Sequence, residues 1–176
     1  PYNEQTMKQQ LIEIKERITS NTTILFDLDG TLVDTDYANF LSYKKAIDQV
    51  IIDKTELDFN SNERFTRTTL ERLFKNVSKA EIDKIVKLKE EFYSIYLDET
   101  NIIEFTKKVL EEFYKSNVTV LVTNCREARA KQILNHHNLS KFFTYYFYRE
   151  VSANGEHINK FENVLSKLKF NPEDVL

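Results

Sequence analysis

Hydrophobic residues follow two different spacings along the chain, and the spacings predict two kinds of element. Apolar residues three and four positions apart predict helices over residues 4–19, 37–52, 62–74, 81–97, 101–114, 126–134 and 159–168. Short apolar or aromatic runs predict strands at residues 24–26, 118–122 and 144–148. Ser78 and Glu81 have the spacing of a capping box, which predicts the start of a helix at this point.

The order of these elements predicts an α/β fold with an insertion. Strands and helices alternate in residues 1–35 and 101–176, which predicts a doubly wound, Rossmann-like parallel sheet with helices on both faces. Residues 36–100 are helical throughout, and one parallel crossover needs far fewer residues. They are therefore interpreted as an inserted helical subdomain, with ordinary crossover helices as the alternative. The first helix is expected to pack its apolar stripe against the sheet.

Two carboxylates follow the first strand. Asp27 and Asp29 are two positions apart, so a strand would point both the same way, beyond the carboxyl end of the sheet, with Leu28 facing the core. Gly30 then gives the backbone the freedom for a sharp exit. The negative charge of carboxylates at the end of a buried strand must be compensated by a cation or by hydrogen-bond donors, which suggests a bound divalent metal. The alternative is an Asp-Gly turn closing a hairpin.

The second strand ends at Thr123 and Asn124. A hydroxyl there, together with the Asn124 backbone N–H at the turn into a helix, can hold phosphoryl oxygens. Both strand ends of a parallel sheet lie at the same edge, so these groups are expected near the carboxylates.

The segment Asp27-x-Asp29-Gly30-Thr31-Leu32-Val33-Asp34, directly after an apolar strand, resembles the first motif of the haloacid dehalogenase-like hydrolase superfamily. The resemblance implies phosphoryl transfer through an aspartyl-phosphate with Mg²⁺. It makes Asp27 the nucleophile, Asp29 the general acid and base, and both of them metal ligands. It also implies that residues 36–100 are a cap over the active site. Asp at position 29 favours the phosphatase and phosphomutase branch over the dehalogenases.

Two further segments are similar to motifs of this family. Thr123 and Asn124 match the second motif, so with Gly30 they are expected to bind the substrate phosphate. Lys160 matches the third motif, the lysine that neutralises charge on the nucleophile and the phosphoryl group, and it follows a turn at Gly155. Phe161 departs from the family pattern, in which Pro often follows the lysine. Asn159 and Lys141 are the alternatives for this lysine position.

The resemblance therefore implies a Mg²⁺-dependent hydrolase of a small phosphorylated metabolite. Two alternatives stay open at this point. One is a sugar phosphomutase, which uses the same residues but excludes water, and the other is a non-catalytic domain that senses phosphate or binds a partner.

Composition excludes several other classes of function. The net charge of −3 gives no reason to expect a nucleic-acid partner. No apolar stretch is long enough to span a bilayer and no secretory signal is evident, so a cytoplasmic protein without a membrane contact is expected. The single cysteine, Cys125, excludes an internal disulfide and fits a reducing compartment.

The family's fourth motif, which completes its magnesium site, is absent from the sequence. Residues 171–176 are similar to the segment that directly precedes the strand with that motif in the family. In the family's strand order this strand lies beside the first one, so the edge of residues 24–26 is expected to be unpaired. Either the sequence is part of a longer protein or a second chain supplies the strand.

Overall fold

The computed structural model describes residues 4–52, 56–152, 158–169 and 172–176. The chain forms two compact units, one made of residues 1–32 and 102–176 and the other of residues 33–101. The predicted helical insertion, residues 36–100, falls within the second unit. None of the described helices is long and apolar enough to cross a membrane.

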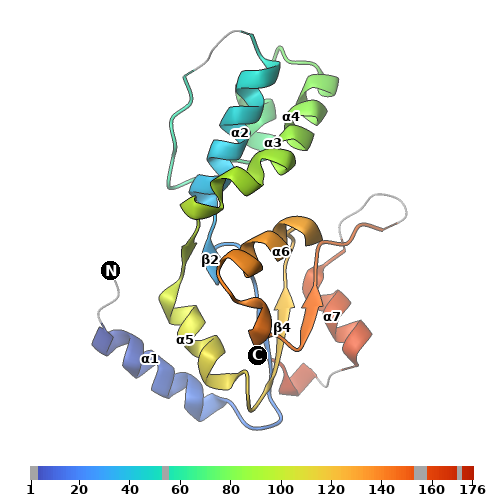
Figure 1. The fold of residues 1–176 in the computed structure, drawn as a ribbon. Helices are drawn as coiled ribbons and strands as arrows, with labels where there is room; N and C mark the ends of the chain where they lie inside the picture. Colours follow the sequence, from blue (N-terminus) through green and yellow to red (C-terminus); the bar gives the residue numbers. More distant parts are fainter. Residues whose placement is uncertain (1–3, 53–55, 153–157, 170–171) are drawn as a thin grey trace. The chain divides into compact units, whose positions relative to one another are not determined.

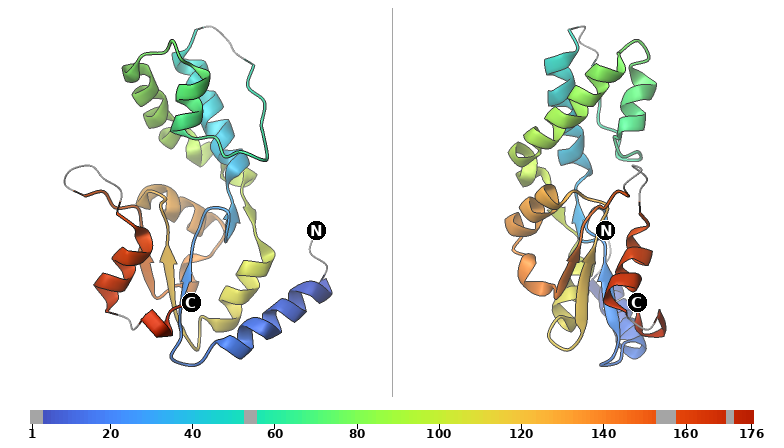
Figure 2. Two further views of the ribbon diagram at one scale, coloured as in Figure 1. Left: turned by 180° about the vertical axis from the view of Figure 1, so that it is seen from behind. Right: turned by 90° about the vertical axis from the view of Figure 1, so that its right-hand side faces the viewer.

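The first unit is built on a parallel sheet, as predicted. Its strands are β1 (Thr23–Phe26), β4 (Val118–Val122) and β5 (Tyr145–Phe147), in the order β1-β4-β5. Phe26 is in register with Leu121, and Val122 is in register with Phe147. Helices α6 (Glu127–His136) and α7 (Lys160–Leu168) lie on opposite faces of the sheet (Figures 1 and 2). The doubly wound α/β fold is therefore confirmed.

The central strand β4 is buried on both faces. Val120, Leu121 and Val122 are all completely buried. Val120 and Val122 share one face and pack against Val164 of α7, whereas Leu121 points to the opposite face. A strand covered on both faces needs no polar positions, which explains why its sequence is a continuous apolar run.

The outer edge of β1 is paired, which corrects the expectation of an open edge at this strand. The chain leaves the short 3₁₀ helix η3 (Pro172–Asp174) and Val175 forms a parallel bridge with Thr23. The Leu25 N–H donates to the Leu176 carbonyl, and the Leu176 N–H donates to the Thr23 carbonyl, both at 2.9 Å. Val175 and Leu176 thus pair with β1 at Thr23 and Leu25, where an unpaired edge was expected.

Helix α1 (Glu4–Arg17) is less buried than its apolar spacing predicts. None of its residues is buried, its apolar stripe is only half-buried, and Ile12 is 52% exposed. An ion pair of 2.6 Å between Lys15 and Glu112 links α1 to helix α5 (Glu104–Phe113). The apolar spacing predicted the helix correctly, but it overestimated how much of the helix the rest of the unit covers.

The second unit is helical. It contains α2 (Asp36–Val50), α3 (Arg67–Leu73), α4 (Lys79–Phe92) and the 3₁₀ helix η1 (Tyr93–Glu99). Its core joins α2, α3, α4 and the segment before α3 through the buried residues Phe40, Tyr43, Ala46, Ile47, Leu57, Phe65, Leu70, Ile82 and Ile85. Strands β2 (Val33–Asp34) and β3 (Asn101–Ile102) form a separate two-stranded sheet.

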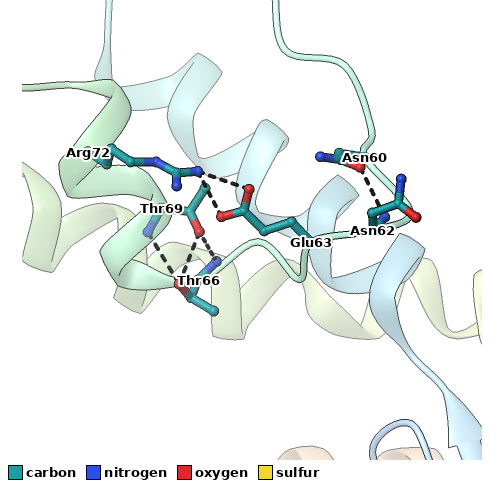
Figure 3. A network of polar contacts seen from close by, with 6 residues as sticks. All are labelled: Asn60, Asn62, Glu63, Thr66, Thr69 and Arg72. Atoms are coloured by element: carbon teal, nitrogen blue, oxygen red, sulfur yellow. Dashed lines mark hydrogen bonds and ion pairs between the residues drawn. The ribbon is translucent and has the colours of Figure 1, made fainter.

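Helix α3 begins five residues later than predicted, because polar side chains bind the backbone before it. The Asn62 N–H donates to Asn60 Oδ1, which forms a turn where the apolar spacing predicted helix (Figure 3). Thr66 and Thr69 form a capping box, with a Thr69 N–H to Thr66 Oγ1 distance of 3.2 Å. Side chains that compete for backbone groups therefore fixed this boundary.

The end of α4 also differs from the prediction. The Ser78–Glu81 capping box starts the helix as expected, but the α-helix ends at Phe92 and the chain bends at Tyr96. Ile95, within the predicted helix 81–97, is 56% exposed. Lys89 of α4 is buried; its ammonium pairs with the neighbouring Glu90 at 3.1 Å and lies over two tyrosine rings. These contacts compensate the cost of burying the charge.

One testable consequence concerns the chain's entry into β1. The buried Asn117 side chain donates hydrogen bonds to the carbonyls of Thr19 and Thr22, at 2.7 and 2.9 Å. Asn117→Ala removes both bonds and is expected to lower the free energy of unfolding by about 1–2 kcal/mol. Urea unfolding followed by circular dichroism measures the change. Asn135→Ala is the control, because it removes an exposed hydrogen bond and should cost less; equal effects would contradict the anchoring role.

Candidate active site

The carboxyl ends of the three parallel strands meet at one edge of the sheet. Because Phe26 pairs with Leu121, Asp27 follows β1 beside the end of β4. The Thr123 N–H donates to the Phe147 carbonyl at 2.9 Å, so Thr123 lies beside the end of β5. The sheet register thus brings the first and second predicted site segments to the same edge, as the sequence indicated.

Asp27 contacts Lys160, the lysine at the start of α7. Lys160 Nζ lies 2.8 Å from Asp27 Oδ2, and the two side chains are 16% and 31% exposed. The other carboxylate oxygen, Oδ1, accepts a hydrogen bond of 2.9 Å from the Leu28 N–H. Both oxygens of the candidate nucleophile are therefore held by donors, and the partly buried ammonium compensates its charge.

Strand β1 ends at Phe26, so Asp27 and Asp29 lie in a tight turn after the strand and not within it. Leu28 is completely buried and its carbonyl accepts from the N–H groups of Thr31 and Leu32, which turns the chain back on itself. Gly30 has a φ of +76°, and a Cβ added there would meet no atom within 4 Å. Glycine is thus required for the backbone conformation and not for space. Asp29, on the other side of Leu28, is half-buried.

Thr123 is almost completely buried, and its hydroxyl shapes the turn that follows β4. Thr123 Oγ1 accepts a hydrogen bond of 3.0 Å from the Cys125 N–H. The side chain of Asn124 is exposed at the tip of this turn. Because Thr123 Oγ1 is here an acceptor, its own proton can be donated to a ligand oxygen. The turn can therefore present a hydroxyl donor and a backbone donor to one anion.

The structure separates Lys160 from the two alternatives for the family lysine. Asn159 is the N-cap of α7, since its Oδ1 accepts from the N–H groups of Phe161 and Glu162. Lys141 is exposed in the 3₁₀ helix η2 (Ser140–Phe142), which precedes β5 and therefore lies toward the opposite edge of the sheet. Gly155, expected in the turn before Lys160, lies outside the described residues.

A cavity of about 500 Å³ adjoins this edge of the sheet. Its lining includes Lys160, Asn124 and Arg149. Arg149 follows β5 as Asp27 follows β1 and Thr123 follows β4. It was not identified from the sequence, although its position after the third strand of the parallel sheet was the available signal.

The acidic residue next to Arg149 is neutralised by a partner on α7. Lys167 Nζ lies 2.5 Å from Glu150 Oε1. The hydrogen bond from Lys167, with a further one from Asn163, holds the pKa of the Glu150 carboxyl below its ordinary value. The described residues that line the cavity include no acidic side chain.

The described part of the chain has no cluster of three or more His, Cys, Asp or Glu side chains that could hold a metal ion. Among the described residues, Asp27 and Asp29 are the carboxylates that follow β1. Mg²⁺ commonly binds through one or two carboxylates while it keeps several waters and contacts a substrate phosphate. The two acidic residues therefore fit Mg²⁺ better than a metal that requires a complete set of protein ligands.

A comparison of the chain with models of known protein families finds a match to one family. The family model described as haloacid dehalogenase-like hydrolase matches residues 24–176. No curated protein matches the chain.

Several solved structures share the fold. A predicted phosphatase from Clostridium acetobutylicum is 21% identical, with a TM-score of 0.69 over 88% of this chain and 74% of its own. A haloacid dehalogenase-like family hydrolase from Streptococcus pneumoniae is 22% identical, with a TM-score of 0.66 over 90% and 75%. A predicted phosphoglycolate phosphatase from Haemophilus somnus is 18% identical, with a TM-score of 0.66 over 89% and 76%.

The buried hydroxyl of Thr123 gives a testable prediction. Thr123→Val keeps the shape of the side chain but removes the acceptor of the Cys125 N–H, so the free energy of unfolding should fall by about 1–3 kcal/mol. Thr123→Ser keeps the acceptor and is the matched control; its loss should be smaller. Urea unfolding of both variants makes the comparison, and a valine variant as stable as the serine variant would show that the hydroxyl does not hold the turn.

Proposed function

Because the chain belongs to the haloacid dehalogenase-like hydrolase family, we propose that it hydrolyses phosphate monoesters of small metabolites at the carboxyl edge of the β1-β4-β5 sheet. The observation that carries the proposal is the 2.8 Å contact between Asp27 Oδ2 and Lys160 Nζ. It joins a carboxylate at the end of the first strand to a cation from the last helix. A phosphoryl group bound beside this pair would meet a nucleophile and a positive charge together.

In the first step a carboxylate oxygen of Asp27 attacks phosphorus in line with the ester oxygen. The bond from phosphorus to the leaving oxygen breaks as the aspartyl-phosphate forms, and Asp29 supplies the proton that the leaving oxygen needs. The equatorial phosphoryl oxygens gain charge density during transfer. The Lys160 ammonium, the Thr123 hydroxyl and the Asn124 N–H are the donors that stabilise this charge.

In the second step water replaces the leaving group. Asp29, now ionised, accepts a proton from water, and the oxygen attacks phosphorus. The bond between phosphorus and Asp27 breaks, which releases orthophosphate and restores both carboxyl groups to their starting protonation states. One residue thus serves as acid and then as base.

Mg²⁺ fits beside these residues, with Asp27 and Asp29 to hold it. When bound, it would add positive charge next to the phosphoryl oxygens and so lower the repulsion between the Asp27 carboxylate and the substrate. The role of residues 36–100 as a cap over the active site stays a prediction.

Asp27→Asn tests the nucleophile. The amide oxygen can still accept from the Leu28 N–H, so the fold should be kept, but the amide cannot form the phosphoenzyme. Release of orthophosphate from para-nitrophenyl phosphate with Mg²⁺ should fall by about a thousandfold or more. Asp48→Asn, which changes an exposed carboxylate on α2, is the control and should keep the parent rate. A variant at position 27 with the parent's turnover would overturn the assignment.

Lys160→Ala tests the cation. Loss of the ammonium removes the charge that stabilises the transferred group, so turnover should fall by on the order of a hundredfold. Lys131→Ala is the control, because it removes an exposed ammonium that pairs only with the solvent-accessible Glu127 among the ion pairs described. Steady-state kinetics of both variants show whether turnover falls because the ammonium is lost from the site or because the net charge of the protein changes. Equal rates would remove Lys160 from the site.

A further inference from the structure

The cavity beside the sheet edge is larger than a phosphoryl group requires. It has a volume of about 500 Å³, and Lys160 forms only one part of its lining. If phosphoryl transfer takes place between Asp27 and Lys160, the rest of the substrate extends from there. The chemistry of the remaining lining residues therefore bears on the leaving group.

Arg149 is held beside the turn that follows β4. Its backbone N–H donates a hydrogen bond of 3.0 Å to the Cys125 carbonyl, two residues after Thr123. The Thr123 N–H is itself bonded to the Phe147 carbonyl, so two successive bonds connect the ends of β4 and β5. The backbone of Arg149 is thus fixed relative to the proposed phosphate-binding turn, while its side chain is exposed at the cavity.

The charges around the cavity favour an anion. Arg149 and Lys160 both line it, and the described lining includes no carboxylate. Lys160 is paired with Asp27 and serves the phosphoryl group in the proposed reaction, so Arg149 is the second cation of the described lining and a candidate to bind a second anionic group.

The other lining residues suggest the body of the ligand. Ile158 and Phe161 are apolar side chains that remain 36% and 45% exposed. Phe161 directly follows Lys160, and its ring lies 5.0 Å from the Lys160 ammonium. An organic group that joins two anions could lie against this apolar wall.

We propose that Arg149 binds a second anionic group, a carboxylate or a further phosphate, on the leaving group of the substrate. This inference rests on the proposed function and narrows its substrate class to phosphate monoesters of acidic molecules. The guanidinium can hold either anion through two parallel N–H donors. Arg149 acts in substrate recognition and takes no part in proton or phosphoryl transfer.

The test compares esters that differ only in charge at one position. 4-Carboxyphenyl phosphate is compared with its neutral analogue 4-carbamoylphenyl phosphate, and 1,4-phenylene bisphosphate tests a phosphate as the second anion. The parent should prefer a doubly anionic ester by about tenfold in kcat/KM, the size of one charge-assisted pair. Arg149→Gln should reduce this preference to near one, and Arg149→Lys should keep part of it.

Arg17→Gln is the matched control, because it removes the same charge from the exposed end of α1 and should keep the parent's preference. The ester that the parent prefers, the carboxylate or the bisphosphate, identifies the second anionic group that the site binds. Either preference supports the proposal if the Arg149→Gln substitution abolishes that preference. A parent without any preference, or an Arg149→Gln variant that keeps it, would overturn the proposal.

Binding separates this proposal from the proposed function. Calorimetric titration of the same esters into Asp27→Asn and into Asp27→Asn with Arg149→Gln measures recognition without turnover. If no ester releases orthophosphate from the parent, the proposed function fails, yet a tenfold difference in affinity between the two variants would still assign Arg149 to anion binding. Equal affinities would remove Arg149 from the site whether or not the parent is active.

Discussion

The hydrogen bonds that hold β1, β4 and β5 in parallel register are the constraint on which the site depends. They set the ends of three separate chain segments side by side, so that Asp27, Thr123 and Arg149 follow neighbouring strands. Lys160 then reaches Asp27 from the start of α7. A short local turn is enough to place each of these residues in the site, because the sheet has already brought their segments together. The free energy gained by burying the apolar strands therefore offsets the cost of holding charged groups close together at the strand ends.

Residues with strong local signals were predicted from the sequence. Asp27 and Thr123 each close an apolar strand, and a parallel sheet leaves few arrangements in which such residues lie apart. The doubly wound core followed from the same alternation of strands and helices. Lys160 lacked a signal of this kind, because a lysine at the start of a helix is usually a surface residue. Only its likeness to the family motif separated it from Asn159 and Lys141.

Other features could not be predicted because they depend on partners remote in the sequence. Leu176 pairs with Thr23 and Leu25 on the side where the family's strand order places the next strand, but the apolar spacing within residues 171–176 did not show that the pairing already begins there. Helix α3 starts late because the side chains of Asn60 and Thr66 bind nearby backbone N–H groups, which outweighs apolar spacing. Likewise, an apolar stripe predicts that α1 is a helix but not how much of it is covered.

The backbone bonds of Leu176 have a consequence for motion at the site. With β4 on one side and Leu176 on the other, β1 is an interior strand at Thr23 and Leu25. A strand segment with hydrogen bonds on both sides opens less readily than one that is paired on one side only. Asp27 follows that segment directly. The backbone that carries this carboxylate is therefore restrained by hydrogen bonds on both sides of the preceding strand.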